Sequence, residues 1–346
     1  MLREILNIVL ILAVISLVAT PTSAPAQQKA VQIVLASWEP VNSPSTVILE
    51  RFAKDLEAAF PGRVKTSLQF GGALGTPAQH YDLALNGSAD ISFLIPSFSP
   101  GRFPVTDLVI LPVRLPSAKI ATSAMLYLRD KGYLNKEYAG VKTLWLAGCT
   151  PYQIQSKKPI TSLSDFKGLK VRAAGQMGKA VEAMGGVPVA MPMTEVYTSL
   201  QRGVVDATVN SMDSVAIFKL NEVTSSVTEF NLAVIPMVVV MNKNSFAKLP
   251  ADVQTFIEQT KTKYSEAIAE YTDGRAVKGW EIHKNEGKPV YQFGATDLEK
   301  MPRLFGPIWA DYIKQFEAKG FPVKAASDDL GSFLTSKFGI KNPIVR

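Results

Sequence analysis

The sequence predicts an α/β fold of two lobes with a cleft between them. Two separate stretches, 31–95 and 169–209, each alternate strand and helix patterns and so repeat one local plan. Such alternation is typical of parallel sheets that are covered by helices on both faces. The chain has 346 residues, which is long enough for two lobes. Because ligands bind beyond the carboxyl ends of strands in open α/β sheets, two facing sheets are expected to form a binding cleft.

The first half begins with a strand and contains two helices. Phe52, Leu56 and Phe60 recur at every fourth position, which places them on one face of the first helix. Thr76 and Gln79 have the spacing of a capping box, which predicts the start of the second helix. The expected order is strand, helix, strand, helix and strand, over residues 31–37, 45–60, 64–70, 76–86 and 89–95.

The second half repeats this order with shorter elements. Val181 and Met184 lie on the apolar face of one helix, and the glycines at 185–186 end it. Thr194 is expected to cap the next helix, and Gly203 to stop it. The expected strands and helices alternate over residues 169–172, 177–184, 187–190, 195–202 and 204–209.

The remaining C-terminal part of the chain has mainly helical patterns. A long pattern starts at Pro250 and continues to about residue 283, with Gly274 or Gly279 as expected break points. A helix of this length can lie across both lobes. Further helices are expected over 297–303 and 307–319.

The N-terminal residues have the pattern of a secretory signal peptide. Arg3 supplies a weak positive charge, and an apolar stretch follows over 5–18. Ala24 and Ala26 fit the A-x-A cleavage pattern. The alternative is an uncleaved membrane anchor, although the apolar stretch is shorter than a membrane span requires. We expect a cleaved signal peptide over residues 1–26 and a soluble, exported product.

The charge pattern argues against one class of partner, and the cysteine content excludes an internal disulfide. The net charge of +7 comes from 37 basic and 30 acidic residues that are mixed along the chain, without a long basic run. This pattern argues against a nucleic-acid partner and weakly favours small anionic ligands. Cys149 is the only cysteine, so no internal disulfide can form. Its apolar neighbours predict a buried small hydrophobe rather than a nucleophile.

The sequence lacks the motifs of common enzymes. No H-E-x-x-H, C-x-x-C, G-x-S-x-G or phosphate-loop pattern occurs. The two histidines, His80 and His283, are far apart, and His80 is expected to have a surface or helix-face role. We therefore predict no catalytic residues, no cofactor and no metal ion.

A few side chains near the expected strand ends suit a small carboxylate. Arg172 ends one strand, and its guanidinium can bind a carboxylate through two parallel N–H donors while it stays charged. Asn210 follows another strand and can donate and accept hydrogen bonds. Trp38 and Met193 would supply apolar walls.

Each of these residues also has a purely structural alternative. Arg172 could be a surface arginine or part of a structural salt bridge. Asn210 could form an Asx-turn, while Trp38 and Met193 could be core residues.

Three blocks of sequence have specific patterns. They read LSDFKGLKVR at 163–172, GGVPVAMPMTEVY at 185–197 and LQRGVVD at 200–206, and Asn210 follows the last. Together they resemble the solute-binding proteins of tripartite ATP-independent periplasmic (TRAP) transporters, over nearly the whole mature chain. The resemblance implies a periplasmic-binding-protein type fold, with a cleft between the lobes and a long helix that crosses both.

The same resemblance divides the chain into lobes and places the protein in the periplasm. Lobe I is expected to comprise residues 27–149 plus about 236–275. Lobe II is expected to comprise residues 150–235 plus about 276–346.

The resemblance also implies roles for individual residues. In this family the arginine of the Lys-x-Arg strand forms a salt bridge to the ligand carboxylate, and Arg172 occupies that position. Asn210 matches an asparagine that contacts the ligand, and Met193 matches a position that packs on it. Sialic-acid-binding members have a second arginine where Tyr152 stands here, and an acidic residue where this chain has Ile95. We therefore expect a monocarboxylate with an uncharged, fairly apolar body, such as a branched 2-oxo acid or an aromatic acid.

The expected function is that of a periplasmic receptor. It closes around a small organic acid and delivers it to TRAP-type permease subunits, acts as a monomer and does not bind nucleic acid. Two alternatives remain open: a receptor that serves a sensor or another partner, and an exported α/β enzyme that acts on a carboxylate. The enzyme would need an acid–base pair in the cleft, and the sequence shows no obvious one.

Overall fold

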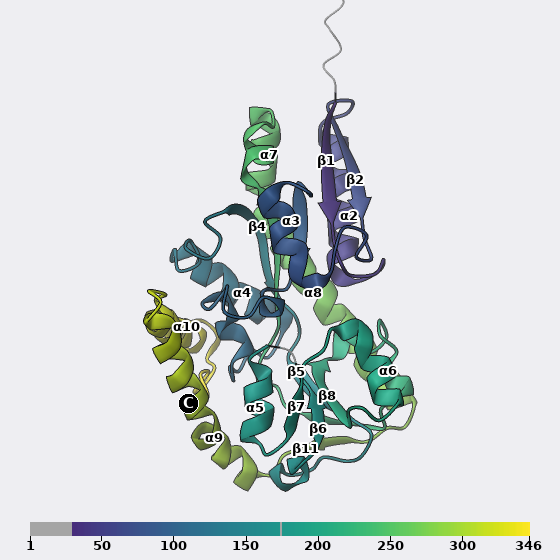
Figure 1. Ribbon diagram of the computed structural model, residues 1–346, viewed down its shortest axis with the longest axis vertical. Coiled ribbons are helices and arrows are strands. Elements are labelled where there is room, and N and C mark those ends of the chain that lie inside the picture. The colour runs from purple at the N-terminus through teal and green to yellow at the C-terminus, as the bar shows by residue number, and fades with distance from the viewer. Residues whose placement is uncertain (1–29, 174) are drawn as a thin grey trace, which may run out of the picture.

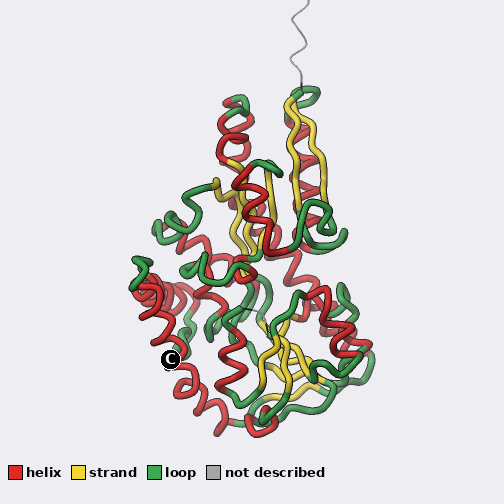
Figure 2. The backbone as a smooth tube through the Cα atoms, in the orientation of Figure 1, coloured by secondary structure: helices red, strands yellow, loops and turns green. Residues whose placement is uncertain are grey.

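Two open β-sheets with helices packed around them form the architecture (Figures 1 and 2). The computed structural model describes residues 30–173 and 175–346. The predicted α/β class with two lobes is confirmed. The predicted signal peptide at 1–26 lies outside the described residues.

The first sheet combines N-terminal strands with one strand that returns from later in the chain. Its order is β2 (Val64–Gln69), β1 (Val31–Ala36), β3 (Ile91–Leu94), β10 (Pro236–Asn242) and β4 (Val141–Gly148). The helices around it are α2 (Pro44–Ala59), α3 (His80–Asn86), α4 (Ala118–Asp130) and α7 (Lys243–Ala247). The predicted capping box of Thr76 and Gln79 is present, and Gly87 ends α3 in the left-handed conformation.

The second sheet carries the residues of the specific sequence blocks. Its order is β11 (Val290–Gln292), β9 (Ser226–Glu229), β5 (Tyr152–Ser156), β8 (Ala207–Ser211), β6 (Lys170–Arg172) and β7 (Val187–Val189). Two short helices, α5 (Met177–Ala183) and α6 (Val196–Gln201), pack beside it. Thr194 lies inside a 3-10 turn, Met193–Glu195, so its predicted role as a helix cap is wrong.

The expectation of purely parallel sheets is wrong, because each sheet contains a strand that runs the other way. β1 pairs in parallel with β2 and β3, but β10 is antiparallel to both β3 and β4. In the second sheet β5 is antiparallel to β8 and β9, while β6 is parallel to β7 and β8. These antiparallel strands are the ones that connect the two sheets, and local strand and helix patterns carry no information about such pairing.

The chain crosses between the sheets at two neighbouring segments. β4 leads into β5 through residues 149–151, and β9 leads into β10 through residues 230–235. The crossing segments bond to each other, since Cys149 N donates to Ile235 O and Tyr152 N donates to Ala233 O, both at 3.0 Å. The two sheets are therefore joined by a paired, two-stranded connection.

Helix α8 (Ala251–Asn285) is a further link between the two sheets (Figure 1). Tyr264 packs its ring against Trp145 of the first sheet, with centroids 5.0 Å apart. Further along, at Gly279, α8 packs against the turn Met212–Ser214 that follows β8 of the second sheet. The helix is continuous, so the predicted break at Gly274 or Gly279 is wrong.

The two short C-terminal helices that were predicted are parts of one long helix, and a further helix follows it. α9 (Ala295–Glu317) passes through both Pro302 and Pro307, and α10 (Val323–Phe338) follows it. The prolines do not end α9 because one apolar face stays buried along its length, through Met301, Phe305, Ile308, Trp309, Tyr312 and Phe316. Packing of this face outweighs the two lost backbone hydrogen bonds.

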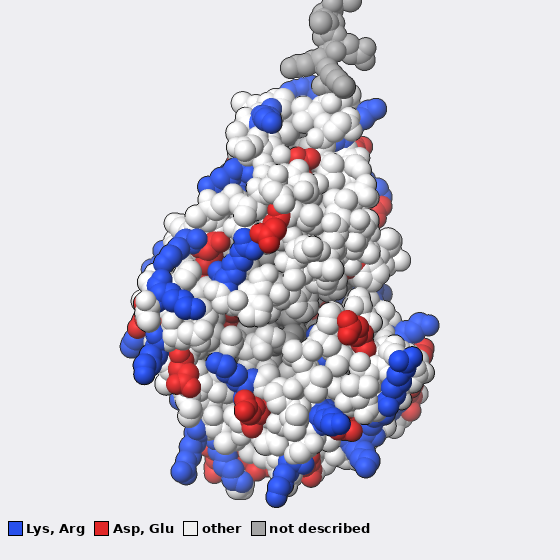
Figure 3. Space-filling model, in the orientation of Figure 1, with Lys and Arg blue, Asp and Glu red and all other residues white. Residues whose placement is uncertain are grey.

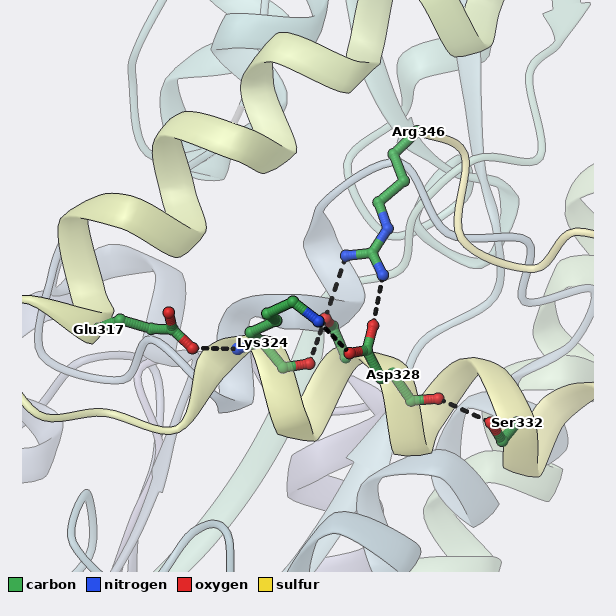
Figure 4. A network of polar contacts seen from close by, with 6 residues as sticks. Glu317, Lys324, Asp328, Ser332 and Arg346 are labelled. Atoms are coloured by element: carbon green, nitrogen blue, oxygen red, sulfur yellow. Dashed lines mark hydrogen bonds and ion pairs between the residues drawn. The ribbon is translucent and has the colours of Figure 1, made fainter.

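The last residues of the chain pack against the part of the molecule that contains the first sheet. Val345 N donates to Pro112 O at 3.0 Å, and α10 packs against α4. Arg346 donates to Asp328 at 2.5 Å, and Lys324 pairs with the same carboxylate at 2.7 Å (Figure 4). These ion pairs are partly exposed and contribute little by themselves, so the backbone bonds and the buried Val345 hold the tail in place.

Charged side chains are mixed over the face of the molecule in Figure 3, with no continuous basic stripe there. Over residues 30–173 and 175–346, no helix combines the length and apolar character needed to cross a membrane.

Candidate functional site

One cavity lies between the two sheets and is lined by every residue predicted for the site. These residues are Trp38, Tyr152, Arg172, Met193 and Asn210. The space free of atoms, together with the open solvent at the mouth of the cavity, is about 520 Å³. The structure therefore brings the five side chains together, and their contact with a ligand stays a prediction.

Arg172 is a buried cation at the end of β6. The residue is 2% exposed, and burial lowers the pKa of its guanidinium from the ordinary value. Nε and Nη2 donate to Met191 O at 3.2 and 3.1 Å, which fixes the plane of the guanidinium. No carboxylate lies within salt-bridge distance of Arg172 in the described part of the chain. A buried arginine without an anionic partner is a candidate binding site for an anion.

Asn210 and Tyr152 face the cavity from adjacent strands of the second sheet. Asn210 lies within β8 rather than after it, and its Nδ2 donates to Ser214 Oγ at 2.6 Å. The same nitrogen lies 3.4 Å from Met193 Sδ, so Met193 also borders the amide. Tyr152 opens β5, and burial raises the pKa of its hydroxyl well above the ordinary value. Tyr152 is thus a neutral wall beside the arginine.

Trp38 supplies an apolar wall from the first sheet. Its ring packs on Phe93 and Phe98, with centroids 6.3 and 5.7 Å away. The residue is 5% exposed, and its Nε1 has no hydrogen-bond partner within the described chain. The remaining apolar lining comes from Ile95, Phe98, Ile217, Phe218, Ile235 and Met237.

Glu39 is a buried acid of the cavity that the sequence analysis missed. It follows Trp38 directly, accepts a hydrogen bond from Ser45 Oγ at 2.5 Å on Oε2, and is 9% exposed. The pKa of its carboxyl is raised to about 7, mainly by burial; the Ser45 hydrogen bond lowers this pKa and the charge of Asp213 raises it. Glu39 lies three residues after the end of β1, so its place near a strand end was the signal available.

Asp213 is the second buried acid that was missed. It lies in the turn after β8, and Thr150 Oγ1 donates to its Oδ1 at 2.9 Å. Burial raises the pKa of its carboxyl, while hydrogen bonds and the charge of Arg275 lower it. Asp213 stands three residues after Asn210, close to a strand end that was already singled out.

Cys149 and His80, which were considered above as possible reactive groups, have structural roles. Cys149 is buried in the cavity wall, where burial raises the pKa of its thiol well above the ordinary value, as expected of a small hydrophobe. His80 is fully buried on α3 and bonded through Nδ1 to Ser92 Oγ at 2.9 Å. A surface role for His80 is therefore wrong, and its helix-face role holds. Among the described residues, no group of His, Cys, Asp and Glu has the arrangement of a metal site.

The two-sheet fold and the cavity between the sheets are typical of solute receptors that bind their ligand between lobes. Residues 35–315 match the family DctP, bacterial extracellular solute-binding protein, family 7. The match covers most of the chain, and the chain therefore belongs to this family of TRAP periplasmic solute-binding proteins. The resemblance found in the sequence is confirmed. Proteins of this family are transport receptors, so the prediction that the chain is not an enzyme is also confirmed.

Individual relatives cover much of the chain at modest identity. A solute-binding protein of Verminephrobacter eiseniae is 26% identical, over 80% of this chain and 83% of that protein. The C4-dicarboxylate-binding periplasmic protein DctP of Rhodobacter capsulatus is 36% identical, over 50% of this chain and 54% of that protein. A marine metagenome TRAP solute-binding protein specific for aromatic acid ligands was solved with metahydroxyphenylacetate. It has a TM-score of 0.81 and 25% identity, over 88% of this chain and 99% of that chain.

Proposed function

We propose that this protein is a periplasmic receptor for a small monocarboxylate with an uncharged, largely apolar body. The observation that carries the proposal is Arg172, a buried guanidinium in a cavity between two sheets with no carboxylate within salt-bridge distance in the described chain. Taking such a charge out of water is unfavourable unless an anion meets it. A ligand carboxylate provides that anion and can use the guanidinium donors that Met191 O leaves free.

Charge in the cavity favours one carboxylate over two. Arg172 is the only lysine or arginine among the cavity-lining residues. The second carboxylate of a dicarboxylate would share the cavity with the carboxylate of Asp213, and like charges in a buried site repel each other. The aromatic-acid receptor from the marine metagenome supports a monocarboxylate, whereas the Rhodobacter protein binds C4-dicarboxylates and represents the alternative.

Ligand binding is proposed to close the cleft. Trp38 reaches the cavity from the first sheet, while Arg172 and Asn210 reach it from the second. A ligand that contacts both sides stabilises the closed state by its extra contacts there, and closure strengthens the arginine–carboxylate bond by excluding water. Delivery of the closed complex to TRAP-type permease subunits follows from the family to which the chain belongs.

The organisation of the mature chain belongs to the same proposal. Cleavage near Ala26 releases a monomer whose lobes are residues 27–149 plus about 236–275, and 150–235 plus about 276–346. The strands of each sheet fall within these boundaries, and α10 also contacts α4 of the first lobe. Intact mass of the exported protein tests the cleavage site, and light scattering after size-exclusion chromatography tests the monomer.

A thermal-unfolding screen against organic acids tests the ligand class. Ligand at about 100 times its Kd adds roughly 2.7 kcal/mol to the free energy of unfolding, enough to raise Tm by several degrees. We expect a shift with aromatic or branched monocarboxylates and none with C4-dicarboxylates. Arg172→Ala should remove the shift, because truncating one member of a buried charge pair weakens binding by roughly 2–5 kcal/mol. Tight binding of dicarboxylates without binding of monocarboxylates would overturn the proposal.

A further inference from the structure

Glu39 and Asp213 approach the same cavity from opposite sheets. Glu39 follows β1 of the first sheet, and Asp213 lies in the turn after β8 of the second. Both residues line this cavity, and the charge of Asp213 raises the pKa of the Glu39 carboxyl. Ser45 Oγ donates to Oε2 of Glu39, and Thr150 Oγ1 donates to Oδ1 of Asp213. The pair is thus a polar patch in an otherwise mainly apolar cavity.

We propose that Glu39 acts as a neutral acid that selects ligands with a hydroxyl group on the body of the monocarboxylate. The inference rests on the proposed function, because it assumes that Arg172 holds the ligand carboxylate. A hydroxyl group is both a donor and an acceptor, so its oxygen can accept from a protonated Glu39 while its hydrogen is donated to the carboxylate of Asp213. A plain hydrocarbon body would leave both acids without these bonds.

Charge balance decides which acid is neutral. Burial raises the pKa of both carboxyls, but hydrogen bonds, including the one from Thr150, and the charge of Arg275 on α8 act against this rise at Asp213. Arg172 is neutralised by the ligand carboxylate, so the cavity-lining residues offer no cation to a second anionic acid at Glu39. Burial and the charge of Asp213 both keep the Glu39 carboxyl protonated, with a pKa of about 7. Cys149 and Tyr152, the other titratable groups that line the cavity, are also kept neutral by burial.

Trp38 is a second, independent indication of a polar ligand group beside Glu39. Its indole Nε1–H is buried without a partner in the described chain, although an unpaired buried donor is unfavourable. Trp38 precedes Glu39 directly and lines the same cavity. A ligand oxygen near Glu39 would provide the acceptor that the indole lacks.

Matched pairs of acids test this selection by isothermal titration calorimetry of the mature protein. The pairs are benzoate and 3-hydroxybenzoate, phenylacetate and 3-hydroxyphenylacetate, phenylacetate and mandelate, and 3-methylbutanoate and 2-hydroxy-3-methylbutanoate. At pH 6 we expect the hydroxylated member of at least one pair to bind about tenfold more tightly. This preference should decline between pH 6 and pH 8.5, because the protonated form that binds is lost as pH rises through the pKa of Glu39.

Two variants separate the role of Glu39 from a merely structural one. Glu39→Gln keeps a neutral hydrogen-bonding group, so the preference for the hydroxyl should persist but lose its pH dependence. In Glu39→Leu the two members of each pair should bind within about twofold of each other. Thermal unfolding of both variants shows whether they are folded.

The outcomes distinguish this inference from the proposed function. If the parent acids bind and no hydroxylated member is preferred, or if Glu39→Leu keeps the preference, the inference is overturned while the receptor for a monocarboxylate stands. If no acid of any pair binds, both are overturned.

Discussion

The residues around Arg172 fix the orientation of its guanidinium and influence its charge. Its Nε and Nη2 are held by Met191 O, and its residue is almost completely buried at the end of β6. Burial lowers the pKa of the guanidinium, yet an arginine starts so high that it remains charged. A lysine at the same place would have a more strongly hydrated charge and no planar fork.

Replacing Arg172 with lysine should therefore weaken binding without abolishing it. We expect Arg172→Lys to bind a monocarboxylate at least about tenfold more weakly than the natural protein, but more tightly than Arg172→Ala, because charge is kept and the two-donor geometry is lost. Isothermal titration calorimetry at neutral pH provides the measurement. Arg202→Lys, on the exposed surface, is the matched control and should bind normally. Equal affinity of Arg172→Lys and the natural protein would contradict the two-donor role.

Most residues of the candidate site were predictable from the sequence, but two buried acids were not predicted. Trp38, Arg172 and Asn210 stand at strand ends, and the fold rule for α/β sheets places such residues together. Glu39 and Asp213 stand beside them and were missed, because their burial results from how the two sheets face each other. Local patterns do not contain that information, and an acid in a loop is usually exposed.

At the scale of elements, the contact between α8 and the turn after β8 sets the position of one cavity wall. Gly279 lies where the helix meets Met212, and a Cβ at Gly279 would be only 2.0 Å from Met212 O. The turn Met212–Ser214 carries Asp213, so the absence of a side chain at Gly279 allows α8 to pack directly behind the cavity.

Adding one methyl group at Gly279 should disturb both stability and binding. We expect Gly279→Ala to lower the free energy of unfolding by about 1–3 kcal/mol, as overpacking does, and to weaken ligand binding by moving Asp213. Gly274→Ala is the matched control in the same helix, because a Cβ there meets nothing within 4 Å. The control should gain about 0.4–1 kcal/mol. Chemical denaturation and calorimetry measure both effects, and a Gly279→Ala protein as stable as the natural one would refute the close packing.

Elements were easier to predict than their pairing. The first three strands and α2 lie within a residue or two of the expected ranges, because β-branched runs and helical periodicity are local signals. The prolines of α9 predicted two helices, but the buried face that runs past them keeps one. β10 lies between β3 and β4, although the chain forms five strands of the second sheet before it returns to the first. Local sequence patterns contain no information about this return.

At the scale of the whole molecule, the fold buries acids that are hard to ionise, both in the cavity and away from it. Burial raises the pKa of Glu39 and of Asp107 to about 7 each, and that of Glu137 to about 8. Asp107 accepts from Ser97 Oγ at 2.9 Å and lies outside the cavity lining. Raised pKa values mean that the folded state holds these protons at pH values where the unfolded chain has lost them.

The free energy of unfolding should consequently fall as pH rises from 6.5 to 8.5. In this window the folded state binds more protons than the unfolded chain, so stability decreases with pH, by about 1–3 kcal/mol in total. Burial lowers the pKa of His80 to about 4, so this histidine affects stability only below its ordinary value and does not mask the trend. Thermal unfolding of the ligand-free protein across the window measures the slope.

Asp107→Asn tests whether buried acids cause that slope. The variant removes one raised carboxyl and keeps an oxygen that can accept from Ser97, so its stability should depend less on pH than that of the natural protein. Asp252→Asn is the matched control, because Asp252 pairs with Arg63 on the surface and its lowered pKa affects stability only at acidic pH. The control should keep the natural slope while its stability at low pH changes. A Tm of the natural protein that stays constant or rises between pH 6.5 and 8.5 would show that these acids are ionised in the folded state and remain in contact with water.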